Sequence, residues 1–338
     1  MPPRRTRAML AEALFQDADL LLFSAADCDP GAGLVTARRW RGGGYETVRV
    51  ALPPLVVIIS DAMGAGQAAV GDWIRAGTAV LDDRAPDKLE QVRLLETSAL
   101  AAHAIPAEAA DPARLEAQFA DCLARWGAIV VKPVDGMRGG NVHFLCPAAG
   151  GTWALHAGRR AETGALPDLT RLLAARIGGR LRYRRFMIQE YVASTYRGML
   201  AALRVDAVRS PTGEWRTIRP VVRIGAIPGS LVSNYAAGTA QIPWDRFFAL
   251  SGVDPAIGHA AERLAWEASA LVDGHPDGSL IETGVDILFS EDGHLRIVEV
   301  NARPESITWE QDRAAWAIDY YLSRVRHLAA PASRSAGG

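Results

Sequence analysis

The sequence predicts an α/β (α+β) protein in which strands and helices alternate early and longer strands dominate later. An apolar run at 55–60, rich in β-branched residues, precedes a helix-like stretch at 67–75 and a strand at 79–81. Together they indicate a unit with a buried parallel strand. Towards the C-terminus, strand-like runs at 286–289 and 295–300 flank an Asp-Gly turn, which favours an antiparallel hairpin.

The remaining elements follow from the same periodicities. Apolar residues at helical spacing predict helices at 7–16, 88–103, 112–126, 256–272 and 311–327. Strands are expected at 20–24, 34–40, 45–50, 128–132, 141–146, 187–192, 199–208 and 215–224. Glycines at 42–44 can take positive φ, so the strands on either side of them should form a hairpin.

Length and composition bound the architecture and the partners. The 338 residues exceed what one hydrophobic core usually organises, so two or three packed units are expected. With 37 basic and 38 acidic residues, the chain lacks the basic excess of nucleic-acid or membrane-surface proteins. Its three separated cysteines form no CxxC pair, which indicates a reducing compartment.

No membrane or secretory segment is expected. The apolar runs at 20–23 and 55–59 are far shorter than the roughly 20 residues that cross a bilayer. The basic N-terminus is followed by a stretch with Glu12, Asp17 and Asp19 rather than by the apolar core of a signal peptide. The sequence therefore predicts a soluble, cytoplasmic protein with no nucleic-acid and no membrane partner.

A glycine-rich loop is the first candidate for phosphate binding. Lys132 ends an apolar strand, and Gly136, Gly139 and Gly140 follow before the chain returns to a strand. Backbone N–H groups of such a loop can close on phosphate oxygens, and a lysine adds a compact positive charge. Taken by itself, the same pattern is equally typical of a surface hairpin with a solvated lysine.

Two acids and an amide near the C-terminus are candidate metal ligands. In an antiparallel hairpin Asp286 lies alongside Glu299, and Asn301 shares the face of Glu299 because side chains alternate along a strand. Such oxygen ligands suit Mg²⁺, which also takes phosphate oxygens from its substrate. The alternative is a satisfied core aspartate and an ordinary strand-end glutamate, although an acid between two apolar residues is costly without a partner.

The segment 186–192 (FMIQEYV) is a candidate adenine-binding strand. It can offer backbone groups to the edge of a base while its apolar neighbours sandwich the ring. An ordinary sheet strand is the competing interpretation.

These motifs occur in the order that ATP-grasp enzymes show: Lys88 before a helix, KPxxGxxGG from Lys132 to Gly140, IQEYV at 188–192, and D…ExNxRP from Asp286 to Pro304. The chain thus resembles D-alanine–D-alanine ligase, glutathione synthetase and the ribosomal-protein glutamate ligases. It is more similar to the YheC/YheD-like ATP-grasp family, from about residue 18 to about residue 325. That family's pattern is echoed at 18–24, 203–205, 222–225 and 229–234.

The resemblance implies an ATP-grasp fold with three domains. A Rossmann-like N-terminal domain would span residues 1–85 and a small lid domain residues 86–186. A C-terminal α+β domain with the metal site would span 187–328, followed by a disordered tail at 329–338. ATP would lie between the lid and the C-terminal domain, and the carboxylate substrate at the junction with the N-terminal domain.

The resemblance also implies roles for individual residues. Nucleotide phosphates would be contacted by Lys88 and Lys132 and covered by Gly136, Arg138, Gly139 and Gly140. Adenine would be held by Gln189, Glu190, Tyr191 and Val192. Two Mg²⁺ ions would be bound by Asp286, Glu299 and Asn301. The acyl phosphate or the incoming carboxylate would face Arg204, Arg223 and Asn234.

Three features depart from the pattern of relatives. Many of them have an acid two places before the arginine at 204, where this chain has Ala202. No acid lies between Tyr191 and Arg204 to contact the ribose. Some peptide ligases have an arginine shortly before the first metal aspartate, where this chain has Gly284 and Val285. These departures leave the substrate more open than nucleotide binding.

The expected activity is that of an ATP- and Mg²⁺-dependent ligase that forms a carbon–nitrogen or carbon–sulfur bond through an acyl phosphate. Its partners would be a small-molecule carboxylate and a nucleophile, with an amine favoured, and a homodimer is one allowed assembly. Two alternatives use the same nucleotide residues. One is an ATP-grasp kinase that phosphorylates a small molecule, and the other is a non-catalytic, spore-coat-like nucleotide-binding protein.

A GxGxxA string at 64–69 follows the first apolar strand, and Asp82 and Asp83 come after the next strand, as in a dinucleotide-binding fold. An ordinary strand-to-helix turn explains the glycines as well. Nothing downstream resembles a hydride-transfer site, so NAD is the minor alternative to ATP.

Overall fold

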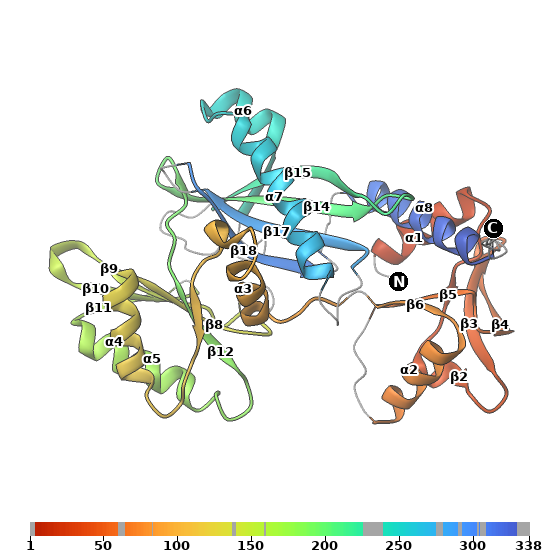
Figure 1. The fold of residues 1–338 in the computed structure, drawn as a ribbon, viewed down its shortest axis with the longest axis horizontal. Helices are drawn as coiled ribbons and strands as arrows, with labels where there is room; N and C mark the ends of the chain where they lie inside the picture. Colours follow the sequence, from red (N-terminus) through yellow and green to blue (C-terminus); the bar gives the residue numbers. More distant parts are fainter. Residues whose placement is uncertain are drawn as a thin grey trace, which may run out of the picture.

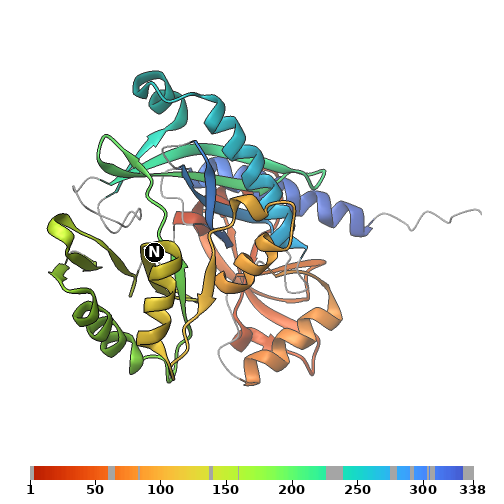
Figure 2. The same ribbon diagram turned by 60° about the vertical axis from the view of Figure 1, so that its left-hand side comes forward.

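The computed structural model describes residues 4–59, 65–82, 84–136, 140–158, 160–225, 239–274, 280–289, 293–302, 304 and 309–329. They form an N-terminal, a middle and a C-terminal part (Figure 1, Figure 2). Helices and several sheets are combined, as the predicted α/β class requires. Within the described ranges, no helix is both long and apolar enough to cross a membrane.

The N-terminal part contains an antiparallel sheet built around the predicted hairpin. Strand β3 (Leu34–Arg41) pairs with β4 (Gly44–Ala51) across a turn in which Gly42 and Gly43 have φ of 60° and 84°. Two short strands, β1 (Leu21–Leu22) and β2 (Cys28–Asp29), also pair with β3. The positive φ values are those that glycine adopts without strain, so the turn follows directly from the sequence.

A parallel βαβ unit follows the antiparallel sheet. It consists of β5 (Leu55–Ile58), α2 (Ala65–Gly77) and β6 (Ala79–Asp82). Strand β5 is less buried than predicted, because β6 is its only partner among the described strands. Ile59, just beyond the strand, is 68% exposed. Of the GxGxxA string, Gly64 lies outside the described residues and the remainder opens α2.

The middle part is a six-stranded antiparallel sheet, ordered β11-β10-β9-β8-β12-β7. One face packs against α4 (Leu115–Trp126) and α5 (Leu166–Gly178). The strands are β7 (Ala107–Ala109), β8 (Ile129–Pro133), β9 (His143–Pro147), β10 (Trp153–Ala157), β11 (Arg160–Gly164) and β12 (Phe186–Glu190). The strand predicted at 187–192 therefore belongs to this sheet, between β8 and β7, and not to the C-terminal part beyond the predicted boundary at 186.

The C-terminal part is an antiparallel sheet ordered β16-β15-β14-β17-β18, with α7 (Ala256–Asp273) packed on one face. Its strands are β14 (Met199–Arg209), β15 (Trp215–Gly225), β16 (Thr239–Pro243), β17 (Glu282–Phe289) and β18 (Leu295–Ala302). A short strand, β13 (Thr195–Tyr196), pairs with β14, and α6 (Trp244–Ser251) follows β16. Leu203, Val285 and Val300 enter the core under α7, so their neighbours in the strands face the other way.

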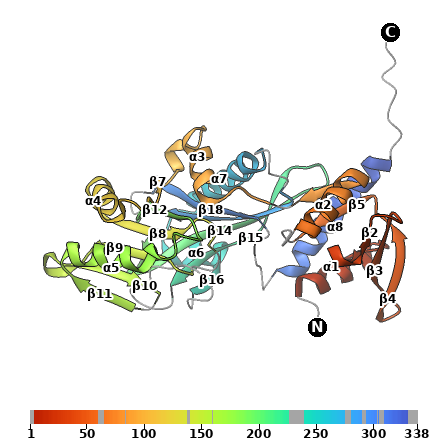
Figure 3. The same ribbon diagram turned by 90° about the horizontal axis from the view of Figure 1, so that it is seen from below.

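Two helices connect the parts. Helix α3 (Lys88–Glu96) packs on β7, β18 and α7, and it ends before the predicted residue 103, with Thr97 as its C-cap and Thr97 Oγ1 bonded back to the Arg93 carbonyl at 2.8 Å. Helix α8 (Glu310–Ala329) lies beside α1 (Arg4–Phe15) (Figure 3). There Arg313 and Arg5 both pair with Glu282 at the start of β17.

His143 of β9 is a buried, neutral histidine. It lies opposite Val131, whose side chain is in the core under α4 and α5, and so it points to that helix-covered face. Neither ring nitrogen has a hydrogen-bond partner in the described part of the chain. Burial, with the positive charges of Arg176 and Arg180, lowers the pKa of His143 to about 4.

Acid should destabilise the fold through His143. The unfolded side chain protonates near pH 6.5 and the folded one near pH 4, so the unfolded state binds more protons between these values. From pH 7 to pH 4 we expect the free energy of unfolding to fall by about 3 kcal/mol more than in a His143→Phe variant. Urea denaturation of both proteins measures this difference, and equal losses would show that His143 is not held neutral.

Candidate active site

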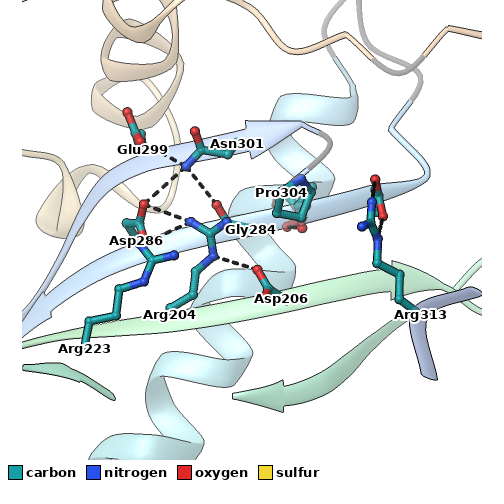
Figure 4. A network of polar contacts seen from close by, with 12 residues as sticks. Arg204, Asp206, Arg223, Gly284, Asp286, Glu299, Asn301, Pro304 and Arg313 are labelled. Carbon is teal, nitrogen blue, oxygen red and sulfur yellow. Dashed lines mark hydrogen bonds and ion pairs between the residues drawn. The ribbon is translucent and has the colours of Figure 1, made fainter. Parts of the chain in front are cut away.

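The β17–β18 hairpin brings the three candidate metal ligands together. Asp286 lies directly opposite Glu299, and Gly284 lies opposite Asn301. The Asn301 amide nitrogen is 3.0 Å from Glu299 Oε1 and 3.3 Å from Asp286 Oδ2. Asp286, Glu299 and Asn301, here called the acidic patch, therefore share the face of the sheet that α7 does not cover (Figure 4).

Two arginines from neighbouring strands share the carboxylate of Asp286. Arg204 of β14 donates through Nη1 to both oxygens, at 3.0 and 2.9 Å, and Arg223 of β15 donates to Oδ1 at 2.9 Å. Burial would raise the pKa of Asp286, but the guanidinium groups of Arg204 and Arg223 outweigh it and hold the pKa below its usual value. The carboxylate is therefore ionised and fully balanced by positive charge.

Two lysines lie near the acidic patch. Lys88, the first residue of α3, has its Nζ 3.1 Å from Glu299 Oε2 and also donates to the carbonyl of Gly136 in the glycine loop. Lys132 near the end of β8 is only 7% exposed. Burial lowers the pKa of Lys132 to about 8, although the charge of Glu299 opposes this shift. A phosphate held between the two ammonium groups would give Lys132 a negatively charged partner and so favour its protonated form.

Lys88 and Lys132 are the only two lysines in the sequence. All its other Lys and Arg side chains are arginines. Lysine differs from arginine in being a compact point charge with three rotatable donors, which suits phosphate oxygens. Among the described residues, none accepts a hydrogen bond from Lys132 Nζ. Both exceptions to the use of arginine thus lie at the candidate site.

The predicted glycine loop is only partly described. Gly136 is tied to the site through Lys88, and Gly140 is exposed at the far end of the loop. The chain leaves the loop through Asn141 with a φ of 59°. Arg138 and Gly139 lie outside the described residues, as does Asn234, so their predicted roles stay predictions.

The predicted adenine strand borders the site, because β12 pairs with β8. Some of its main-chain N–H groups are already hydrogen-bonded within the protein and so are not available to a base. The amides of Glu190 and Tyr191 donate to main-chain carbonyls elsewhere in the chain, and the buried side chain of Gln189 donates to another. Within the described residues, the amide of Val192 has no such partner, so it is the main-chain donor left for the edge of a base.

Asp206 is a residue of this site that the sequence pattern did not single out. It lies two residues after Arg204 on β14 and accepts a hydrogen bond from Arg204 Nε at 2.6 Å. The available indication was the alternation of charged, apolar and charged residues from Arg204 to Asp206, which places both charges on one face. On the other side of Arg204, the position where relatives have an acid is occupied by Ala202, which is buried in the sheet.

The donor set fits a magnesium site that the substrate completes. The acidic patch offers two carboxylates and, when the amide of Asn301 turns over, an amide oxygen, which are the hard ligands that Mg²⁺ prefers. In the described part of the chain, no group of three or more His, Cys, Asp or Glu side chains could hold an ion alone. Such a site therefore requires phosphate oxygens and water as further ligands.

Two antiparallel sheets, with Lys132 on a strand of one and the acidic patch on the other, form an ATP-grasp ligase fold. The sequence matches the YheC/D-like ATP-grasp family over residues 77–325, and the chain belongs to this family. The residues before 77 lie outside that match. No curated protein matches the sequence.

Solved structures share this fold at low sequence identity. The ATP-grasp ligase PsnB, complexed with a minimal precursor, is 16% identical over 96% of this chain and 95% of its own, with a TM-score of 0.54. D-cycloserine synthetase DcsG is 16% identical over 77% of each chain, with a TM-score of 0.48. N5-carboxyaminoimidazole synthase from Aspergillus clavatus, complexed with ADP and 5-aminoimidazole ribonucleotide, is 14% identical over 78% of this chain and 58% of its own, with a TM-score of 0.46.

Asp286 should contribute more to stability than Glu299. The Asp286→Asn variant leaves Arg223 without its carboxylate and Arg204 with one in place of two, and the side chains of these arginines are only 13% and 5% exposed. We expect a loss of about 3 kcal/mol in the free energy of unfolding. Glu299→Gln removes one of two partners of Lys88, which keeps its bond to the Gly136 carbonyl, so it should cost less, about 1 kcal/mol. Urea denaturation compares the two variants, and similar losses would contradict the shared carboxylate.

Proposed function

We propose that this protein is an ATP- and Mg²⁺-dependent ligase that activates a carboxylate as an acyl phosphate and joins it to a nucleophile, with an amine favoured. One observation carries the proposal: both lysines of the sequence lie at the acidic patch, with the buried Arg204 and the partly buried Arg223 bonded to its Asp286. Positive groups for phosphates, oxygen ligands for a metal and guanidinium groups for a further anion are the parts that phosphoryl transfer to a carboxylate requires.

In this proposal ATP lies between the middle and the C-terminal sheets. Lys88 and Lys132, the two lysines of the sequence, hold the phosphates with their ammonium groups. The loop that closes over the phosphates is the one with Gly136, Arg138, Gly139 and Gly140. Adenine lies against the strand with Gln189, Glu190, Tyr191 and Val192, where the Val192 amide can donate to the base.

The acidic patch would hold the metal ions, two by expectation. When bound there, Mg²⁺ would supply positive charge that offsets the charge of the phosphates during phosphoryl transfer. Asp286 and Glu299 are already fixed side by side, since the arginines hold the first and Lys88 holds the second. The ligands therefore need little reorganisation to receive the nucleotide.

The proposed reaction has two transfers. In the first, a carboxylate oxygen of the substrate bonds to the γ-phosphorus as the bond from that phosphorus to the ADP oxygen breaks. In the second, the nucleophile bonds to the acyl carbon as phosphate leaves with the electron pair, and the nucleophile's proton passes to solvent. To Arg204, Arg223 and Asn234 we assign stabilisation of the negative charge on the transferred groups.

The two lysines provide a direct test of nucleotide binding. An amine-selective reagent can modify only Lys88, Lys132 and the terminal amine, because the sequence has no other lysine. Mg·ATP should slow the modification of both lysines about tenfold or more, as charge-assisted contacts to phosphate cover them. Peptide mass spectrometry measures the two rates separately. Protection by NADH in place of ATP would favour the dinucleotide alternative.

Lys132→Ala should weaken ATP binding by about 1–3 kcal/mol, the scale of lost charge-assisted hydrogen bonds. Isothermal calorimetry with Mg·ATP gives the affinity. Arg171→Ala is the matched control, because this arginine lies on α5 with a side chain that is 67% exposed and, among the described residues, pairs only with Asp168. The assignment of Lys132 fails when both variants bind ATP as the wild type does.

The activation step can be tested before the nucleophile is known. ADP release should require a carboxylate, and hydroxylamine should intercept the acyl phosphate as a hydroxamate. The panel comprises amino acids, dicarboxylates and peptides, with ADP and hydroxamate measured together. Arg223→Ala should suppress hydroxamate formation far more than ATP binding, because its role is at the transferred group.

The other outcomes of this assay identify the alternatives. A stable phosphorylated product, formed with ADP but without hydroxamate, would identify a small-molecule kinase. ATP binding without ADP release on any member of the panel would favour the non-catalytic nucleotide-binding protein.

A further inference from the structure

Arg204 is fixed by two carboxylates on different sides. Its Nε donates to Asp206 at 2.6 Å, whereas its Nη1 donates to both oxygens of Asp286 (Figure 4). The Arg204 side chain is only 5% exposed. A guanidinium group is planar, so bonds from Nε and from Nη1 together fix both its position and the plane in which it lies.

The third constraint on Arg204 is steric and comes from Gly284. This glycine lies opposite Asp206 on β14 and opposite Asn301 on β18. A Cβ at position 284 would lie 2.1 Å from Arg204 Nη2 and 2.6 Å from Pro304 Cβ. The guanidinium group thus covers the main chain of Gly284 and occupies the space that any other side chain would fill.

Asp206 is itself held from the side away from the acidic patch. A cavity of about 10 Å³, enough for one water molecule, is lined there by Asp206, Glu282, Pro304 and Arg313. The negative charge of Asp206 contributes to raising the pKa of Arg313, so the two groups attract each other across this space. Asp206 therefore lies between two cations, Arg204 and Arg313. It is not part of the acidic patch but holds Arg204, which binds Asp286 of the patch.

We propose that Asp206 and Gly284 position Arg204 so that its terminal nitrogens meet the γ-phosphoryl group of ATP, an inference that rests on the proposed function. Asp206 acts by charge, because it holds Nε in one orientation. Gly284 acts by leaving room for the group. Without Asp206, Arg204 would keep only Asp286 as a carboxylate partner among the described residues and would turn towards it.

Affinity for two nucleotides tests the proposal without a known substrate. The dissociation constants of ADP and of the non-hydrolysable analogue AMP-PNP are measured by calorimetry at one Mg²⁺ concentration, and their ratio reports the contact with the γ-phosphoryl group. Arg204→Gln, Asp206→Ala and Gly284→Ala should each reduce the preference for AMP-PNP about tenfold. Asp206→Asn, which keeps an acceptor oxygen, should reduce it less.

Two further proteins make the test specific to Arg204. In the Arg204→Gln background, Asp206→Ala should cause no additional loss of preference, because Asp206 acts through the missing group. Gly225→Ala is the matched steric control. Gly225 ends β15 in the same sheet, and a Cβ there would meet no atom closer than 3.5 Å. Its preference for AMP-PNP should equal that of the wild type.

The remaining outcomes separate this inference from the proposed function. Parallel loss of ADP and AMP-PNP affinity in Asp206→Ala would mean a structural role only and would overturn the positioning role. An additional loss in the double variant would overturn it as well. If the wild type prefers AMP-PNP and all variants keep that preference, the positioning role is wrong but the proposed function stands. If the wild type binds neither nucleotide, both the proposed function and this inference are wrong.

Discussion

The ionised carboxylate of Asp286, shared by two arginines, is the interaction on which the active face depends. A charge buried in a sheet is stable only when it is paired, and here the pairs form a row from Arg223 through Asp286 and Arg204 to Asp206. The other face of the same strands is apolar and packs on α7. Alternation along β14 and β17 thus gives one sheet both a core and a polar surface on which anionic substrates can be held.

A second set of ion pairs links this sheet to the ends of the chain. Glu282 at the start of β17 pairs with Arg313 of α8 and with Arg5 of α1, while Arg5 also donates to the carbonyl of Pro304. Helices α1 and α8 therefore pack against each other where they meet the sheet. The strand that carries Asp286 is thus also the strand to which α1 is bound through Arg5.

The sequence predicted best what local patterns determine. The glycine turn, the βαβ unit and the β17–β18 hairpin depend on neighbouring residues, and so does the placing of Glu299 and Asn301 on one face. It did not indicate that β12 pairs within the middle sheet or that the Glu190 and Tyr191 amides are already used, because these bonds join distant segments. Asp206 was missed for a related reason: its role is visible only once the orientation of Arg204 is known.

The use of only two lysines has a practical consequence for spectroscopy. Reductive methylation with ¹³C-formaldehyde would introduce labelled methyl groups at Lys88, Lys132 and the terminal amine and nowhere else. Because both side chains lie beside the acidic patch, two of the three labelled amines in such a sample would report on the candidate site. Two single substitutions would assign it, and the response of each lysine to any added molecule could then be followed separately.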